Sequence, residues 1–494
     1  VEDIQKDIAS QMDSSLLEAI DEWRHFAMLH APKTHIKNTG GNAATAMLYR
    51  VKDVVGTGLE KTVNEISKAT GHGEIEKTKS IMSPIKSKED KALVDFAKSD
   101  YETNMKDIAT SAGSGKVNMK SAIEKHKNVF NSNPIGKALN KIPVLGKGTK
   151  AVGNVLDKAA KGNSALLDAE DNFFIKQNYT NALSKYMKAN KYTPEYLKSA
   201  EGSEALSKAQ DYALKQALEA TFHDDNVIAT GLNKIINSHS FVKFLGDAFI
   251  PYKKTPLNIA RRAVEYSPVG LAKGTRDFAR STSNWGSSET TNAIDELAKG
   301  LTGSGLMALG FLASHKGYLT SGLTDDKKLN GLEKAEGKQN FALNLKDYTV
   351  SLESFSPAAI PLLAGAGLYE TMSKGNKLEP GAVVDTLGAL LSPMVEMSVL
   401  SSVDSLITDV SYAKQGGEDI LTAGIGSAVK SYAGQLMPTS LSNLSNTLDD
   451  TKRSSSYIDK NKSTGKIIQG IENQYKYKNP LTHKQLPPSL DVWG

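Results

Sequence analysis

Residues 248–271 read AFIPYKKTPLNIARRAVEYSPVGL, and this stretch divides the chain into two parts of different composition. Thr255 followed by Pro256 predicts a helix start, because threonine caps a first turn and proline there has no N–H to leave unpaired. Apolar residues then recur at helical spacing. Ser267 followed by Pro268 predicts the helix end, since a residue before proline disfavours the α region.

The sequence before this hinge is polar and rich in lysine, whereas the sequence after it is rich in Gly, Ala and Leu. The hinge itself has a basic flank, formed by Lys253, Lys254, Arg261 and Arg262. Two interpretations follow: a surface helix between two helical regions, or a junction that faces a membrane or a nucleic acid.

Length and composition exclude some classes of protein. The chain has 494 residues, 39% of them hydrophobic and 23% charged, a length that allows two to four domains. It has no cysteine, which excludes disulfides and thiolate sites, and its net charge of +5 is mild. No uninterrupted apolar run reaches the length of a transmembrane helix. The chain begins at Val1, and we expect it to be part of a larger precursor.

The first half of the chain contains a cluster of lysines with a high local net charge. Residues 116–162 carry ten lysines against two acidic residues, a net charge of 10 − 2 = +8. Such a face suits phosphate backbones or anionic lipid, although a solvated surface explains it equally well. The candidate contact residues in this cluster are Lys116, Lys120, Lys125, Lys127, Lys137, Lys141, Lys147 and Lys150.

The apolar periodicity predicts a mainly α-helical, elongated multi-helix protein with one small β-hairpin near 340–353. Proline ends a first helix at residue 31, a polar loop covers 33–42, and the next helix starts near Ala43. Thr193 followed by Pro194 predicts a short capped helix. The predicted regions are 1–162 (basic, helical), 163–247 (helical hairpin), 248–320 (hinge and Gly-rich apolar helix), 321–448 (β-hairpin and apolar helices) and 449–494 (extended tail).

Segments beyond the hinge are nearly uncharged but too short to cross a bilayer alone. They fit either a buried core or an interface with a membrane or another subunit. The candidate contact residues are Leu306, Met307, Leu309, Phe311, Leu312, Ile360, Leu362 and Leu363, and Trp493 is a candidate anchor of the tail. Residues 380–419 are acidic, which suits contacts with the basic first half of another copy.

We find no sequence pattern for catalysis. Residues 110–117 resemble a phosphate loop but lack its first glycine and the hydroxyl residue after the lysine. A divalent cation could be held by imidazole and carboxylate ligands, although such residues at helix ends are usually caps; the candidates are His223, Asp224 and Asp225, together with Asp168, Glu170 and Asp171. We therefore expect a non-enzyme with no cofactor and no metal.

Several short motifs together resemble the C-terminal region of very large polyvalent proteins encoded by tailed phages and prophages. The matching stretches are residues 23–29, 33–38, 41–42, 166–174, 220–224, 250–271, 297–310, 355–361 and 486–494. The resemblance implies a helical component of the virion, packaged inside the capsid and delivered with the DNA. It implies no catalytic residues.

From this resemblance we expect an internal virion (ejection) protein that lies near the portal and helps to form a conduit across the host envelope. Its partners would be further copies of itself, other virion proteins such as the portal, packaged DNA and the host membrane. One alternative is a structural protein of the capsid interior that stays in the particle. A second alternative is a DNA-binding module that uses the lysine cluster.

Overall fold

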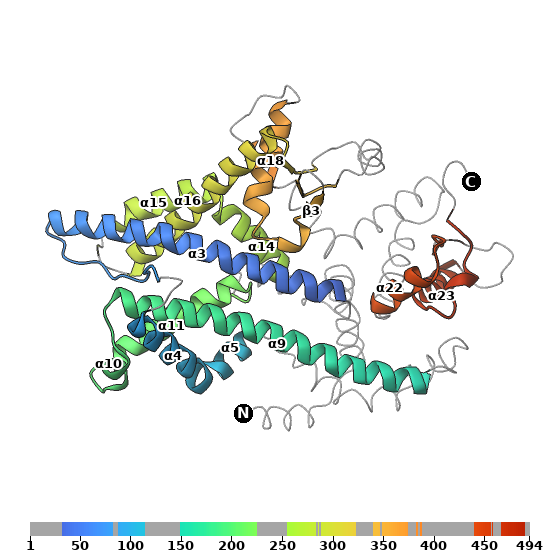
Figure 1. Ribbon diagram of the computed structural model, residues 1–494, viewed down its shortest axis with the longest axis horizontal. Helices are drawn as coiled ribbons and strands as arrows, with labels where there is room; N and C mark the ends of the chain where they lie inside the picture. The colour runs from blue at the N-terminus through green and yellow to red at the C-terminus, as the bar shows by residue number, and fades with distance from the viewer. Residues whose placement is uncertain are drawn as a thin grey trace.

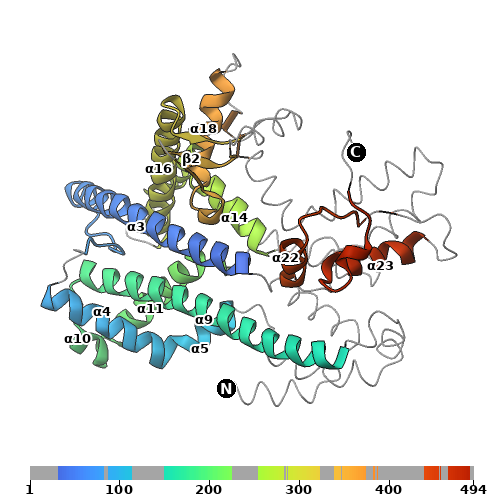
Figure 2. The same cartoon turned by 45° about the vertical axis from the view of Figure 1, so that its right-hand side comes forward.

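A computed structural model describes residues 32–82, 87–113, 149–224, 254–282, 285, 288–322, 339–345, 348–373, 382–383, 386–387, 439–455, 457 and 466–489. The described part is mainly α-helical, which confirms the predicted fold class. Figure 1 shows α3 running between a group of helices around α16 and a second group around α9. Figure 2 shows the same order of layers after rotation.

The group around α9 is called the α9 half. Its core is formed by residues such as Tyr101, Tyr179, Leu183 and Met187, which are almost completely buried. The Tyr179 hydroxyl donates a hydrogen bond of 2.6 Å to Asp100. This half consists of α4 (Lys88–Asp100), the π-helical turn η1 (Tyr101–Met105), α5 (Lys106–Gly113), α9 (Thr149–Ala189), α10 (Pro194–Lys198) and α11 (Ser203–Ala220).

The group around α16 is called the α16 half, and it has an apolar core of its own around Met307, Leu319, Ile360 and Leu363. It consists of α3 (Pro32–Ala69) with the segment to residue 82, α14 (Lys254–Glu265), α15 (Pro268–Ser281), α16 (Ser288–His315), three strands, η3 (Glu353–Phe355) and α18 (Ile360–Ser373). The C-terminal helices α22 (Thr439–Leu448) and α23 (Lys466–Lys478) pack together, followed by η5 (His483–Gln485).

Glycines allow α16 and α18 to cross at short range. A methyl group added to Gly310 would collide with the backbone carbonyl of Leu362, and one added to Gly365 would collide with that of Met307. The Gly-rich sequence of the apolar segments therefore produces close packing between two helices of one chain.

The predicted β-hairpin is confirmed. Strand β2 (Ala342–Asn344) pairs antiparallel with β3 (Thr349–Ser351), with Leu343 opposite Val350. Strand β1 (Leu319–Thr320) pairs with the other edge of β2 and makes a three-stranded sheet. Sequence alternation could not reveal β1 because the strand has only two residues.

The predicted loop at 33–42 was wrong, because α3 begins at Pro32 and continues through both glycines. The positions of Gly40 and Gly41 explain the error. A Cβ atom at Gly40 would lie 2.7 Å from the Ser354 carbonyl oxygen, and one at Gly41 would lie 2.6 Å from that of Ser356. Glycine at these two positions lets η3 and the turn after it pack closely against α3. The two glycines therefore do not mark a loop.

The Ser267-Pro268 pair of the hinge lies between two helices, α14 and α15. Helix α14 covers the predicted helix and ends at Glu265, but Thr255 lies within it and does not cap its start, because Lys254 is already helical. The Ser267 hydroxyl oxygen then accepts hydrogen bonds from the backbone N–H groups of Val269 (3.2 Å) and Gly270 (3.4 Å), and Pro268 opens α15. The Ser-Pro pair therefore ends one helix and caps the next.

Two predicted region boundaries differ from the structure. Helix α9 runs without a break across residues 162 and 163, and α23 lies within the tail that was expected to be extended. Other expectations lie outside the described residues: the helix at 1–31, the lysines from 116 to 147, the part of the helical hairpin region from 225 to 247, Lys253 and Trp493. Within the described ranges, no helix combines the length and hydropathy needed to span a membrane.

Candidate functional site

The α9 half and the α16 half meet across charged side chains, and we call this interface the polar seam. Each half has a separate apolar core, and the cluster around Leu48, Tyr49 and Ala220 is a small apolar contact between them. The polar seam consists of Lys52, Asp53, Glu60, Lys79, Lys185, Gln216, Glu219, Arg262, Glu265, Asp295 and Lys299, all buried or nearly so.

Lys299 of α16 is the most highly connected cation of the seam. Its ammonium nitrogen lies 3.3 Å from Glu219 of α11, 3.6 Å from Glu265, 3.4 Å from Asp295 and 3.0 Å from Glu296. The Glu219 contact crosses from one half to the other. A buried ammonium is tolerated here because several carboxylates surround it.

A second group of cations surrounds Asp295. Lys52 of α3 lies 2.9 Å from Asp295 and donates a hydrogen bond of 2.6 Å to Gln216 of α11. Lys79 lies 3.1 Å from Asp295 and 3.6 Å from Glu60. Lys52 therefore links α3, α11 and α16 at one point.

The pKa values reflect this arrangement. Burial alone would raise the pKa of Asp295, but attraction to Lys52, Lys79 and Lys299 holds it well below its usual value. Burial opposes ionisation of Glu219 as well, yet Lys299 and Arg262 lower its pKa to about 2. Burial likewise opposes the charge on Lys299, and the surrounding carboxylates raise its pKa well above the usual range. Asp295, Glu219 and Lys299 are therefore all charged at neutral pH.

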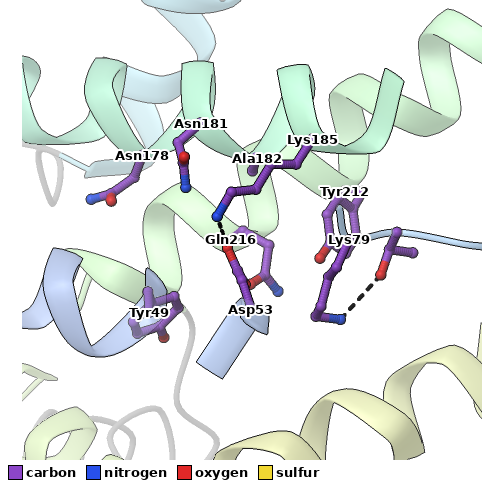
Figure 3. Close-up of a pocket in the computed structure, with 10 residues that line it drawn as sticks. Tyr49, Asp53, Lys79, Asn178, Asn181, Ala182, Lys185, Tyr212 and Gln216 are labelled. Atoms are coloured by element: carbon purple, nitrogen blue, oxygen red, sulfur yellow. Dashed lines mark hydrogen bonds and ion pairs between the residues drawn. The ribbon is translucent and has the colours of Figure 1, made fainter. Parts of the chain in front are cut away.

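The α3–α9 side of the seam encloses a small cavity of about 10 Å³. Figure 3 shows Lys185 of α9 extending toward Asp53 of α3, and their charged atoms lie 2.5 Å apart. Tyr212 of α11 lines the same cavity, and burial raises the pKa of its hydroxyl above the usual value. A site this small and enclosed cannot admit a substrate.

An open cleft of about 520 Å³ lies at the other end of the seam, between α11, α14 and α16. Arg261 and Arg262 of the hinge helix both pair with Asp224, which follows α11. Arg262 also bonds to Glu265. Charged residues and two leucines line the cleft: Asp211, Leu214, Lys215, Leu218, Glu219, Asp224, Arg261, Arg262, Glu265 and Glu296.

Three of the short sequence motifs converge in a second polar cluster. The Nδ1 atom of His35 lies 3.0 Å from Glu170, and the Asn38 amide donates to both Glu170 (3.1 Å) and Asp171 (3.4 Å). The Nε2 atom of His223 lies 3.7 Å from Asp171. The structure thus brings Glu170, Asp171 and His223 together, and sequence reasoning missed His35 and Asn38. Asp224 instead pairs with Arg261 and Arg262, whereas Asp225 and the side chain of Asp168 lie outside the described set. Among the described residues no group of these side chains has the geometry of a metal site.

The structure separates the predicted contact residues into buried and exposed groups. Arg262 is buried in the seam, so it could reach a phosphate only if the seam opened. Met307, Ile360 and Leu363 are core residues, whereas Leu309 and Leu312 are exposed. Leu306, Phe311 and Leu362 are partly buried. Lys150 and Lys254 lie in helices, but their side chains are outside the described set.

Sequence reasoning missed Lys52, Asp295 and Lys299, although a signal was present. Asp295, Glu296 and Lys299 are the charged residues in the otherwise uncharged stretch 290–314. Charges within such an apolar stretch predict burial with partners, because an isolated buried charge is too costly. The partners themselves come from distant segments and could not be read from the sequence.

Comparison with known proteins identifies no relative: no family model, no curated protein and no solved structure matches this chain.

Proposed function

We propose that this chain is a non-enzymatic internal virion (ejection) protein of a tailed phage, packaged in the capsid near the portal and delivered with the DNA. In this role it helps to form a conduit across the host envelope. The proposal rests on the sequence motifs, because they resemble the C-terminal region of phage polyvalent proteins over most of the chain.

The observation that supports delivery is the polar seam between two apolar cores. A protein that leaves a capsid through a narrow tail must open its tertiary structure. Separating the α9 half from the α16 half exposes mainly charged groups, which water then hydrates. Such an opening costs less than splitting one apolar core, whose exposure to water is penalised in proportion to its area.

Quantitative mass spectrometry of virions tests the proposal. Full particles are compared with particles triggered to release their DNA, and the amount of this chain is measured relative to the major capsid protein. The proposal expects loss of the chain together with the DNA. Retention would instead favour the alternative that the chain is a structural protein of the capsid interior or the portal region.

The DNA-binding alternative is tested separately. Phosphate contacts release counterions, so binding through a lysine cluster would weaken steeply as salt increases. Titration of the chain with duplex DNA at several salt concentrations measures this slope. Binding that is absent or insensitive to salt would eliminate that alternative.

A further inference from the structure

Four buried polar groups line one small cavity beside the polar seam. They are the hydroxyls of Thr45, Tyr49 and Tyr266 and the Nε–H group of Arg262, and the cavity has a volume of about 20 Å³. Among the described residues none of these four groups has a hydrogen-bond partner, and none is exposed to bulk solvent. We call this space the hydroxyl cavity. It lies at the small apolar contact between the two halves.

Helical spacing places these side chains together. Thr45 and Tyr49 are four residues apart on α3 and therefore share one face. Arg262 and Tyr266 have the same spacing at the end of α14, where the Tyr266 N–H donates to the Arg262 carbonyl (2.9 Å). The ring centroids of Tyr49 and Tyr266 lie 6.2 Å apart, which brings the two pairs face to face. Figure 3 shows the Tyr49 hydroxyl pointing away from Lys185 of α9.

The guanidinium of Arg262 leaves one donor for the cavity. One of its terminal nitrogens donates to Glu265, and the other donates to Asp224 (2.6 Å). The Nε–H group remains. Buried polar groups in folded proteins are nearly always bonded to protein or to ordered water, because an unpaired one loses its hydration without compensation. One N–H donor and three hydroxyls together require a partner that both accepts and donates.

The size and the charges of the cavity select water as this partner. A volume of about 20 Å³ is enough for one water molecule. Burial raises the pKa of Tyr49 and of Tyr266, so both hydroxyls stay neutral. The positive charge of Arg262 disfavours a cation, and the carboxylates of Glu219 and Glu265 beside it disfavour an anion.

We propose that the hydroxyl cavity holds one internal water molecule. This water accepts a hydrogen bond from the Nε–H group of Arg262 and bonds to the hydroxyls of Tyr49, Tyr266 and Thr45. Arg262 also lies 4.0 Å from Glu219 of α11, so the water positions an arginine that faces the α9 half. The inference goes beyond the proposed function and does not depend on it.

Replacement of each tyrosine with phenylalanine tests the inference by the sign of the effect. Tyr49→Phe and Tyr266→Phe each remove one hydroxyl and keep the ring. If the hydroxyls bond to a water, each substitution removes a hydrogen bond, and we expect the equilibrium constant for unfolding to rise about fivefold. If the hydroxyls have no partner, the constant should fall instead, because a costly buried polar group is deleted. Urea unfolding followed by circular dichroism measures both variants.

The double variant shows whether the two hydroxyls share one partner. Removing either hydroxyl weakens the water site, so the combined effect should be smaller than the product of the two single effects. Tyr101→Phe is the matched control, because the Tyr101 hydroxyl donates directly to Asn172 (2.6 Å) in the separate core of the α9 half. Combined with Tyr49→Phe, it should give the full product, since the two hydroxyls have no common partner.

A crystal structure at a resolution of about 2 Å observes the site directly. We expect an ordered water at about 3 Å from the Nε atom of Arg262 and from the hydroxyls of Tyr49 and Tyr266. The double phenylalanine variant should lose this water. Any of three results would overturn the inference: phenylalanine variants as stable as the wild type or more stable, single effects that multiply in the double variant, or a cavity without ordered density in the wild-type crystal.

Discussion

Replacing Lys299 with methionine tests whether the polar seam stabilises the fold. Methionine keeps much of the length of the side chain and removes its charge. Four carboxylates lie between 3.0 and 3.6 Å from the Lys299 nitrogen. We expect the free energy of unfolding at neutral pH to fall by about 3 kcal/mol, the lower end of the range for breaking a buried ion pair.

The magnitude follows from what remains after the substitution. At an effective dielectric constant of about 20, unit charges separated by 3.3 Å attract by roughly 5 kcal/mol, and desolvation of the ammonium offsets much of this. Asp295 still has Lys52 and Lys79, and Arg262 still faces Glu219 and Glu265. Because no carboxylate loses its last cation, the upper end of the range is not reached.

Lys273→Met is the matched control. Lys273 lies 3.3 Å from the same Glu296, but its side chain is 52% exposed, against 2% for Lys299. An exposed pair contributes little, so this variant should lose no more than about 0.5 kcal/mol. Urea unfolding followed by circular dichroism measures both variants. A Lys299→Met protein as stable as Lys273→Met would refute the view that the seam holds the two halves together.

Two further predictions concern pH and packing. The pKa of Glu219 is lowered from 4.5 to about 2, so its stabilisation is present above pH 4.5 and is lost as pH falls toward 2. This loss corresponds to roughly 3 kcal/mol, and Glu219→Gln should flatten the acid limb of a stability–pH curve; an unchanged limb would contradict the assignment. Gly310→Ala should destabilise by more than about 2 kcal/mol through collision with Leu362, whereas Gly305→Ala, with open space around it, should stabilise by about 0.5–1 kcal/mol in thermal unfolding. Equal effects at the two glycines would show that the crossing of α16 and α18 is looser than described.

Local signals in the sequence predicted the elements that depend on neighbouring residues. Thr193 caps α10 as its Thr-Pro pair indicates, and its side chain accepts a hydrogen bond from the Tyr196 backbone N–H. The alternation at 340–353 gave the hairpin. The predictions failed where the local structure depends on a segment that is distant in the sequence. Gly40 and Gly41 predicted a loop from their local sequence, whereas in the structure they lie in a helix and pack against the turn around Ser354.

The same division applies to the candidate sites. Glu170, Asp171 and His223 could be grouped in advance because their helices were expected to be neighbours, and the structure adds His35 from α3. The polar seam could not be predicted in this way. Lys52, Gln216 and Asp295 lie far apart in the sequence, and pairwise charge complementarity does not identify which of many charged residues will meet.

The polar seam has a physical consequence for separation of the two halves. While the halves are joined, the ammonium of Lys185 and the carboxylate of Glu219 neutralise charges on α3 and α16 from the α9 half. Separation would bring these charges into water, where hydration offsets part of the lost ion-pair energy. An apolar contact has no such compensation, because its exposure to water is penalised in proportion to its area. Charged groups between the halves therefore join them at neutral pH and make their separation less costly than that of one continuous apolar core.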